Sequence, residues 1–164
     1  MPRTWPHGTP VRLREAVIVT AAVTLAACAA PPAPVPPTIA NVALMAAADT
    51  NPTRAGQPAP VVVRVYQLGS TAAFEKAEFY QLLNNDTASL GTDLVKKDEY
   101  LLAPGTSKTE LLTVPDTVRA IGVFAAYREF GRVTWRATVA LPPHATTAVT
   151  VTAAKTGISA AAAP

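Results

Sequence analysis

The sequence VVVRVYQL, Val61 to Leu68, is almost continuous in β-branched and other apolar side chains. Its two polar residues, Arg64 and Gln67, fall on opposite phases of a two-residue alternation, so neither face of a strand here is polar throughout. This pattern is typical of a strand that is buried on most of both faces. We therefore expect Val61–Leu68 to be a strand in the interior of a packed β domain.

Short apolar runs separated by proline and glycine turns lie on both sides of this strand. Val118–Tyr127 is largely apolar on both phases, whereas Arg132–Leu141 alternates cleanly, with Trp135 on its apolar phase. The further strands that we expect are Ile39–Ala48, Asp93–Val95, Glu99–Leu102, Ser107–Val114, Val118–Tyr127, Arg132–Leu141 and Thr146–Ala153. About seven short strands of this kind predict a mainly β fold, a two-sheet β-sandwich.

One segment breaks the β pattern and predicts a helix. Ala72–Leu83 contains no glycine, proline or β-branched residue, and Ser70 or Thr71 before it can cap a first turn. We expect Asn84-Asn85-Asp86 to end this single inserted helix, and the helix to lie over one end or edge of the sandwich.

Composition limits the function. The chain has 14 Lys and Arg against 11 Asp and Glu, and three of the arginines precede residue 28, so the domain behind them is nearly neutral. The sequence contains no basic patch with interleaved aromatic residues, so it gives no sign of nucleic-acid binding. His144 has no cysteine or second histidine to complete a metal site, and we find no nucleophile elbow or phosphate-binding glycine turn. We predict that the protein is not an enzyme.

The first 27 residues have the three parts of an export signal. Arginines at positions 3, 12 and 14 precede an apolar stretch, Ala16–Ala27, that ends in small residues. Twelve helical residues rise only about 18 Å, which is too short to cross a bilayer. We therefore expect residues 1–27 to be removed as a signal peptide.

Cys28, the only cysteine, follows Leu25-Ala26-Ala27 directly. This tetrad resembles the lipobox of bacterial lipoproteins, in which the cysteine carries a diacylglycerol and an N-acyl chain. A buried free thiol is the alternative, but the proline-rich residues that follow cannot form a core. We expect Cys28 to be the lipid attachment site, with residues 28–38 as a tether and no other cofactor. Ala29 is not the aspartate that retains such proteins at the inner membrane, which predicts the outer membrane, on its periplasmic face.

Two other segments are defined by composition. Asp49–Pro60 contains three prolines and a glycine without periodicity, and it is long for a connection between strands. From the residues alone, it is either a functional loop or a solvated insertion. Residues 39–153 form the predicted sandwich domain, and residues 154–164 are expected to be a disordered, alanine-rich tail.

The order of several motifs is similar to that of a known family. PVVVRVYQL (residues 60–68), FEKAEF (74–79), LAPG (102–105) and VFAAYR (123–128), with Trp135-Arg136 and the lipobox, resemble the outer-membrane lipoproteins of the type VI secretion system (TssJ, also called VasD or SciN). The resemblance covers about Ile39 to Thr152.

The resemblance implies a transthyretin-like sandwich that belongs to the trans-envelope membrane complex. It also implies a partner, the periplasmic C-terminal region of the IcmF-like (TssM) inner-membrane subunit, which the loop between the first two strands contacts. The candidate partner-binding residues are Asp49, Thr50, Asn51, Pro52, Thr53, Arg54, Ala55, Gly56, Gln57 and Pro58. The alternative is a carbohydrate- or peptidoglycan-binding lipoprotein, which would need exposed aromatics on a concave face; Tyr66, Tyr100 and Trp135 fit core or edge positions better.

Overall fold

The computed structural model describes residues 1, 4 and 33–163 of the 164-residue chain. The folded unit begins at Val35. Cys28 and the apolar stretch of the signal lie outside the described residues, so their predicted roles stay predictions. Within the described part, no helix is both long and apolar enough to cross a bilayer.

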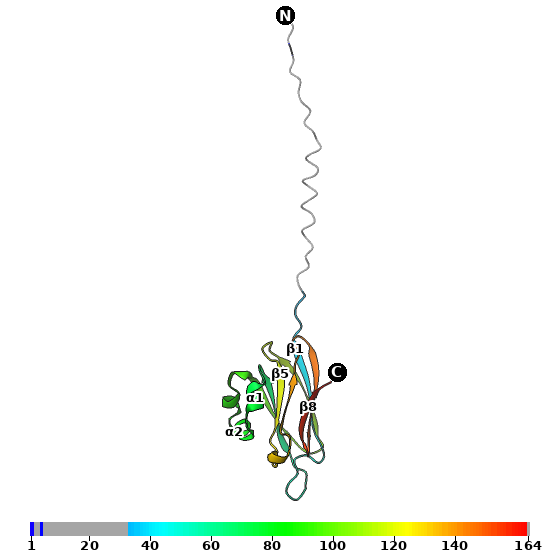
Figure 1. Ribbon diagram of the computed structural model, residues 1–164. Helices are drawn as coiled ribbons and strands as arrows, with labels where there is room; N and C mark the ends of the chain where they lie inside the picture. The colour runs from blue at the N-terminus through cyan, green and yellow to red at the C-terminus, as the bar shows by residue number, and fades with distance from the viewer. Residues whose placement is uncertain (2–3, 5–32, 164) are drawn as a thin grey trace. The chain divides into compact units, whose positions relative to one another are not determined.

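Two four-stranded sheets pack face to face (Figure 1). The first sheet has the order β4-β1-β7-β8, and its strands are β1 (Thr38–Ala46), β4 (Ser107–Val114), β7 (Thr146–Ala154) and β8 (Gly157–Ala162). The second has the order β3-β2-β5-β6, and its strands are β3 (Leu94–Leu102), β2 (Val61–Leu68), β5 (Ala120–Ala125) and β6 (Arg136–Ala140). Strand β1 pairs with β4 antiparallel and with β7 parallel; the second sheet is antiparallel throughout. The predicted two-sheet sandwich with a helical insertion is confirmed.

The main core lies between the sheets. Val61, Val63 and Val65 of β2 point into it because alternate residues of a strand face the same side. From the other sheet, Val42 and Leu44 of β1 meet them, and none of these five side chains is more than 1% exposed. Burial of one such side chain stabilises the fold by about 1.5 to 3 kcal/mol.

A second, smaller core lies on the outer face of the second sheet. Tyr66 of β2 and Phe124 of β5 are fully buried there by the helices α1 (Ala72–Lys76) and α2 (Phe79–Leu90). Phe74 of α1 packs against the Tyr66 ring with the centroids 5.5 Å apart. The prediction that the helix would cover an end or edge is therefore wrong: the helical segment covers a sheet face, and this explains why β2 is apolar on both phases.

The prediction of a single helix ending at Asn84-Asn85-Asp86 is also wrong. Ala77 is extended, and the side chains of Glu78 and Gln81 form a capping box that starts α2 as a new helix. Asn85 has non-helical φ and ψ, but α2 resumes after this kink and ends at Leu90.

Asp86 fastens the helical segment to the sheet. Its carboxylate, 8% exposed, lies 2.8 Å from Lys97 Nζ and 3.2 Å from a guanidinium nitrogen of Arg64, and it accepts a hydrogen bond from the Tyr66 hydroxyl. Arg64 also donates to the carbonyls of Leu82 and Leu83, beside the kink. Burial alone would raise the pKa of Asp86, but the hydrogen bonds from Lys97, Tyr66 and the Thr87 amide outweigh it and hold that pKa below its usual value.

Three strand predictions need correction. Residues 93–95 and 99–102 were expected as separate pieces, but β3 is one strand, because its charged middle lies on a sheet edge where charge is tolerated. Strands β5 and β6 are shorter than expected. Phe130–Arg132 form a 3-10 turn before β6, so Trp135 precedes that strand and is half buried between the two cores.

The predicted disordered tail is wrong. Strand β8 pairs with β7 from Gly157 to Ala162, and Ile158 is 2% exposed within the main core. Gly157 has φ of 136° and lies against the backbone of Thr134, a close approach that a Cβ would block. One buried isoleucine and the backbone ladder order a segment whose alanines alone predict no strand. The tether boundary also moves, because Thr38 already belongs to β1.

Candidate functional site

The β1–β2 loop, residues 47–60, crosses from one sheet to the other and projects from the end of the sandwich opposite the start of β1 (Figure 1). We call this end of the domain the loop end. The connections β3–β4, β5–β6 and β7–β8 lie there too: the Gly105 amide bonds to the Ala46 carbonyl, and the Ala47 amide bonds to the Ala153 carbonyl.

The tip of the β1–β2 loop is a self-bonded turn. The Thr53 amide donates to the Gln57 carbonyl at 2.8 Å, and the Gly56 amide donates to the Thr53 carbonyl at 2.8 Å. The Thr53 hydroxyl oxygen also accepts from the Gln57 amide at 3.2 Å. Gly56 has φ of 78°, which favours glycine at this position. The tip therefore has a defined shape of its own, with the side chains of Arg54 and Gln57 exposed.

Asn51 locks the base of the loop. It is 3% exposed and has φ of 45°, a left-handed conformation that asparagine adopts more readily than most residues. Its Nδ2 donates to the Pro60 carbonyl at 2.7 Å, and its Oδ1 accepts from the Arg128 amide at 3.0 Å. One amide side chain thus closes the loop and joins it to the β5–β6 connection, residues 126–135.

Beneath the base, Thr50 and Tyr127 are buried, at 0% and 4% exposure. Burial raises the pKa of Tyr127 to about 12. The phenol is therefore neutral at physiological pH, so the two buried side chains beneath the loop, Thr50 and Tyr127, are both uncharged.

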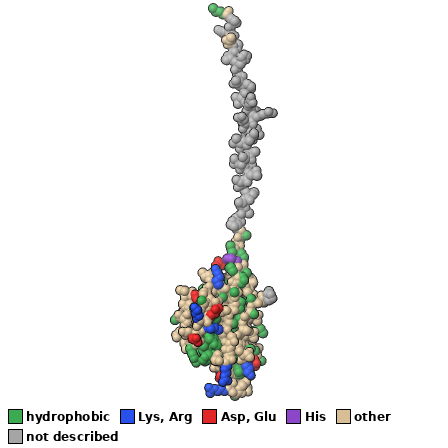
Figure 2. All heavy atoms as spheres, in the orientation of Figure 1, with side chains coloured by type: hydrophobic (Ala, Val, Ile, Leu, Met, Phe, Trp, Pro, Cys, Tyr) green, Lys and Arg blue, Asp and Glu red, His purple; other side chains and the backbone are tan. Residues whose placement is uncertain are grey.

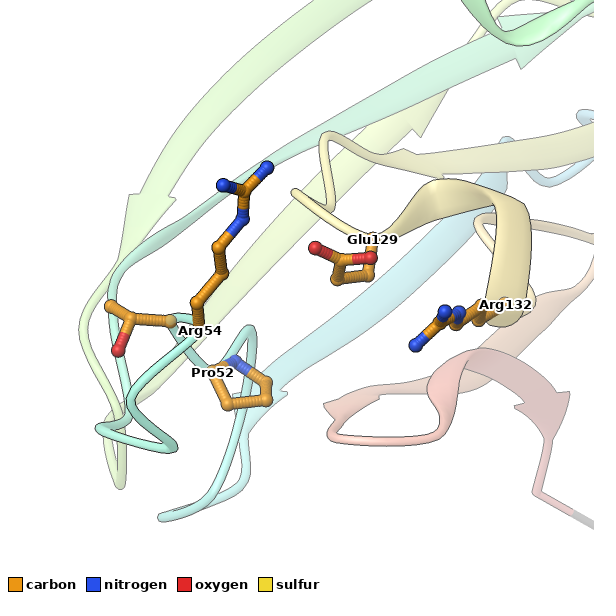
Figure 3. A pocket seen from close by; sticks show the side chains of 5 residues that line it. Pro52, Arg54, Glu129 and Arg132 are labelled. Atoms are coloured by element: carbon orange, nitrogen blue, oxygen red, sulfur yellow. The ribbon is translucent and has the colours of Figure 1, made fainter.

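A shallow cavity of about 470 Å³ lies between the loop and the β5–β6 connection. Figure 3 shows its walls: Pro52, Thr53 and Arg54 on the loop, and Glu129 and Arg132 on the connection. The arginine side chains come from opposite sides, with the Glu129 carboxylate between the two segments. The arrangement offers charged and polar groups for binding. No group of three or more His, Cys, Asp or Glu side chains able to hold a metal ion occurs among the described residues.

The structure divides the ten candidate residues into three groups. Pro52, Thr53 and Arg54 line the cavity; Asp49 and residues 55–58 are exposed around it. Thr50 and Asn51 are buried, so they support the loop rather than offer surface. Sequence reasoning missed Glu129 and Arg132, although the charges clustered at residues 128–132, where one expected strand ends and the next begins, were a usable signal.

The aromatics relevant to carbohydrate binding do not form a concave exposed face. Tyr66 is fully buried, and Tyr100 is half buried with the Lys108 ammonium 4.7 Å from its ring centroid. Trp135 packs edge-on against Phe79. No specific observation favours the carbohydrate-binding alternative.

A β-sandwich with helices on one outer face and a hydrogen-bonded loop projecting from one end defines the class of domain. The sequence profile of the type VI secretion lipoproteins (VasD, EvfM, TssJ) matches residues 38–156, and the chain belongs to this family. The predicted family is confirmed.

Solved structures agree with this assignment. The T6SS lipoprotein TssJ1 from Pseudomonas aeruginosa is 38% identical, with a TM-score of 0.76, over 79% of this chain and 98% of that one. Serratia marcescens Lip, a membrane-bound component of the type VI secretion system, is 29% identical, with a TM-score of 0.70, over 76% and 96%. A chain of a structure described as the type VI membrane complex is 26% identical, with a TM-score of 0.65, over 77% and 98%. No curated protein matches the sequence.

Proposed function

We propose that this type VI secretion lipoprotein links the outer membrane to the inner-membrane part of the secretion complex. Its β1–β2 loop binds the periplasmic C-terminal region of the IcmF-like (TssM) subunit. The observation that carries this proposal is the order of the loop: its tip bonds to itself and Asn51 fixes its base. A loop that is rigid before binding loses little conformational freedom on association.

The membrane attachment in this proposal is Cys28. A diacylglycerol on its sulfur and an N-acyl chain on its new amino group together provide firm anchoring, whereas a single chain gives only marginal binding. The chain then runs from the tether into β1 at Thr38, and β1 leads directly into the loop. Ala29 at the position after the cysteine supports delivery to the outer membrane, with the domain in the periplasm.

The loop assignment is tested by replacing Thr53–Gln57 with two glycines. The Thr53 amide and the Gln57 carbonyl are 2.8 Å apart, so a short bridge can close the gap without disturbing Asn51. We expect pull-down of the purified periplasmic region of the inner-membrane subunit to be lost, while urea denaturation shows a folded domain. The matched control changes Asp116 and Thr117 to glycine in the connection at the other end and should bind normally. Undiminished binding by the loop variant would refute the assignment.

The anchor is tested by Cys28→Ser. We expect the variant to fractionate as a soluble periplasmic protein with normal urea stability and to fail to support secretion. The fractionation is done in a strain that lacks the inner-membrane subunit, because that partner could hold the protein at the envelope. Recovery of the variant with outer membranes in that strain would show that the anchor is elsewhere.

A further inference from the structure

Positive side chains at the loop end differ from those on the rest of the domain. Arg64, Lys96, Lys97 and Lys108 each lie within 3.3 Å of a carboxylate. Arg119 and Arg136 donate to backbone carbonyls. Among the described residues, no ion pair or side-chain hydrogen bond involves the exposed cations of the loop end, which are Arg54, Arg128, Arg132 and Lys155. Of the other Lys and Arg side chains in the described part of the chain, only that of Lys76 also forms no ion pair or hydrogen bond there.

Few acidic residues balance these cations. Asp49 and Glu129 are the only acids in the four connections of the loop end, and neither forms an ion pair within the described part of the chain. Figure 2 shows Lys and Arg side chains at this end of the domain. Because its charge is unpaired and exposed, the loop end can interact with an anionic partner without first breaking contacts of its own.

Two of the arginines are arranged around one space. Arg54 on the β1–β2 loop and Arg132 on the β5–β6 connection line the cavity from opposite sides (Figure 3). The hydrogen bond from the Arg128 amide to Asn51 Oδ1 fixes the two segments relative to each other. The backbone positions from which the two arginine side chains extend are therefore held relative to each other.

We infer that the β1–β2 loop and residues 128–132 form one docking surface that takes an acidic protein segment, whose carboxylates are bound by the exposed guanidinium groups of Arg54, Arg128 and Arg132. Guanidinium groups bind carboxylates through paired hydrogen bonds, which gives direction as well as attraction. This inference rests on the proposed function, and it adds a second contact segment and a charge requirement for the partner.

An anionic lipid surface fits the observations less well. The large exposed apolar side chains of the described domain are Val35, Met45, Tyr80, Val95, Leu101 and Leu111, and none lies in either segment. Interfacial binding to lipid requires such side chains beside the positive charge. Moreover, the nine residues of β1 span about 30 Å, so the surface is that far from the point where the tether enters the domain.

The test uses isothermal titration of the mature chain, from residue 28 and carrying Cys28→Ser, with the purified periplasmic region of the inner-membrane subunit. We expect Arg132→Gln and Arg128→Gln each to weaken binding about three- to tenfold. The wild-type affinity should fall between about 50 and about 300 mM salt, less steeply in each variant. Lys76→Gln removes an exposed, unpaired cation elsewhere and should bind like the wild type.

The outcomes separate the two proposals. If the arginine variants bind like the wild type while replacement of Thr53–Gln57 abolishes binding, the composite surface is refuted and the proposed function stands. If that replacement also binds normally, the loop function fails and the composite surface fails with it. If phosphatidylglycerol vesicles, without the protein partner, bind the chain in a manner that Arg132→Gln abolishes, the assignment to an acidic protein is overturned.

Discussion

Replacement of Asn51 by alanine tests whether one amide side chain orders the loop end. The change removes the hydrogen bonds to the Pro60 carbonyl and from the Arg128 amide, at 2.7 and 3.0 Å. Each is worth about 1 kcal/mol net, and water can partly replace them because Pro60 and Arg128 are exposed. Alanine also tolerates φ of 45° less well, at a cost of about 1 kcal/mol. We expect the free energy of unfolding to fall by about 2 to 3 kcal/mol.

The assay is urea denaturation of the mature chain, followed by the fluorescence of Trp135, the only tryptophan after residue 28. The midpoint should fall while the slope with denaturant stays constant, because the surface exposed on unfolding is nearly unchanged. Asn41→Ala is the matched control, since Asn41 is exposed on β1 and no side-chain hydrogen bond of the described residues involves it. If the two variants agree within about 0.5 kcal/mol, the amide does not hold the loop.

Three further predictions concern the rest of the fold. Asp86→Asn leaves Lys97 and Arg64 without their shared carboxylate, and we expect the free energy of unfolding in urea to fall by about 2 to 3 kcal/mol. Because the pKa of Asp86 is lowered in the folded state, this loss of stability relative to wild type should be complete above pH about 4 and should shrink as the pH falls further. Gly157→Ala should cost about 3 kcal/mol through collision with the Thr134 backbone, whereas Gly131→Ala, where a Cβ meets nothing within 4 Å, should change the midpoint little. Ile158→Ala should cost about 3 kcal/mol and accelerate amide exchange in β8, and unchanged exchange there would show that β8 does not depend on that side chain.

The strands that sequence predicted well are those in which side-chain pattern and packing agree. Ser107–Val114 was predicted with the bounds of β4, and the apolar density of Val61–Leu68 marked β2. The apolar pattern of this strand does not show what buries its second face. Tyr66 is buried there by helices that cover the outer face of the sheet, and strand periodicity alone does not predict such a helical layer.

The errors have a common physical cause. Contacts with residues elsewhere in the fold determine the secondary structure of segments whose own sequence favours that structure weakly or favours another one. Asp86 contacts Lys97 and Arg64, which are distant in sequence, and α2 continues past an asparagine pair that locally signals its end. Strand β8 depends on β7 and on one isoleucine.

The candidate site was only half visible in the sequence. Proline and glycine content marked the β1–β2 loop, but the β5–β6 connection joins it through a backbone amide, which has no side-chain signature. The sequence also could not show which of the ten candidate residues are buried. In the sequence, Thr50 and Asn51 look like any other small polar loop residues, and only the folded structure shows that they are buried.

The position of β1 has a mechanical consequence. A pulling force applied between Thr38 and the β1–β2 loop would run lengthwise through β1, which pairs over eight residues with β4 on one side and over eight with β7 on the other. Both points of attachment lie on the same segment of chain, so the covalent backbone of β1, which is already extended, carries the tension. A force that entered on one strand and left on another would instead have to pass through the hydrogen bonds of a ladder. The domain can therefore transmit tension from the start of its first strand to its loop end while both ladders of β1 stay intact.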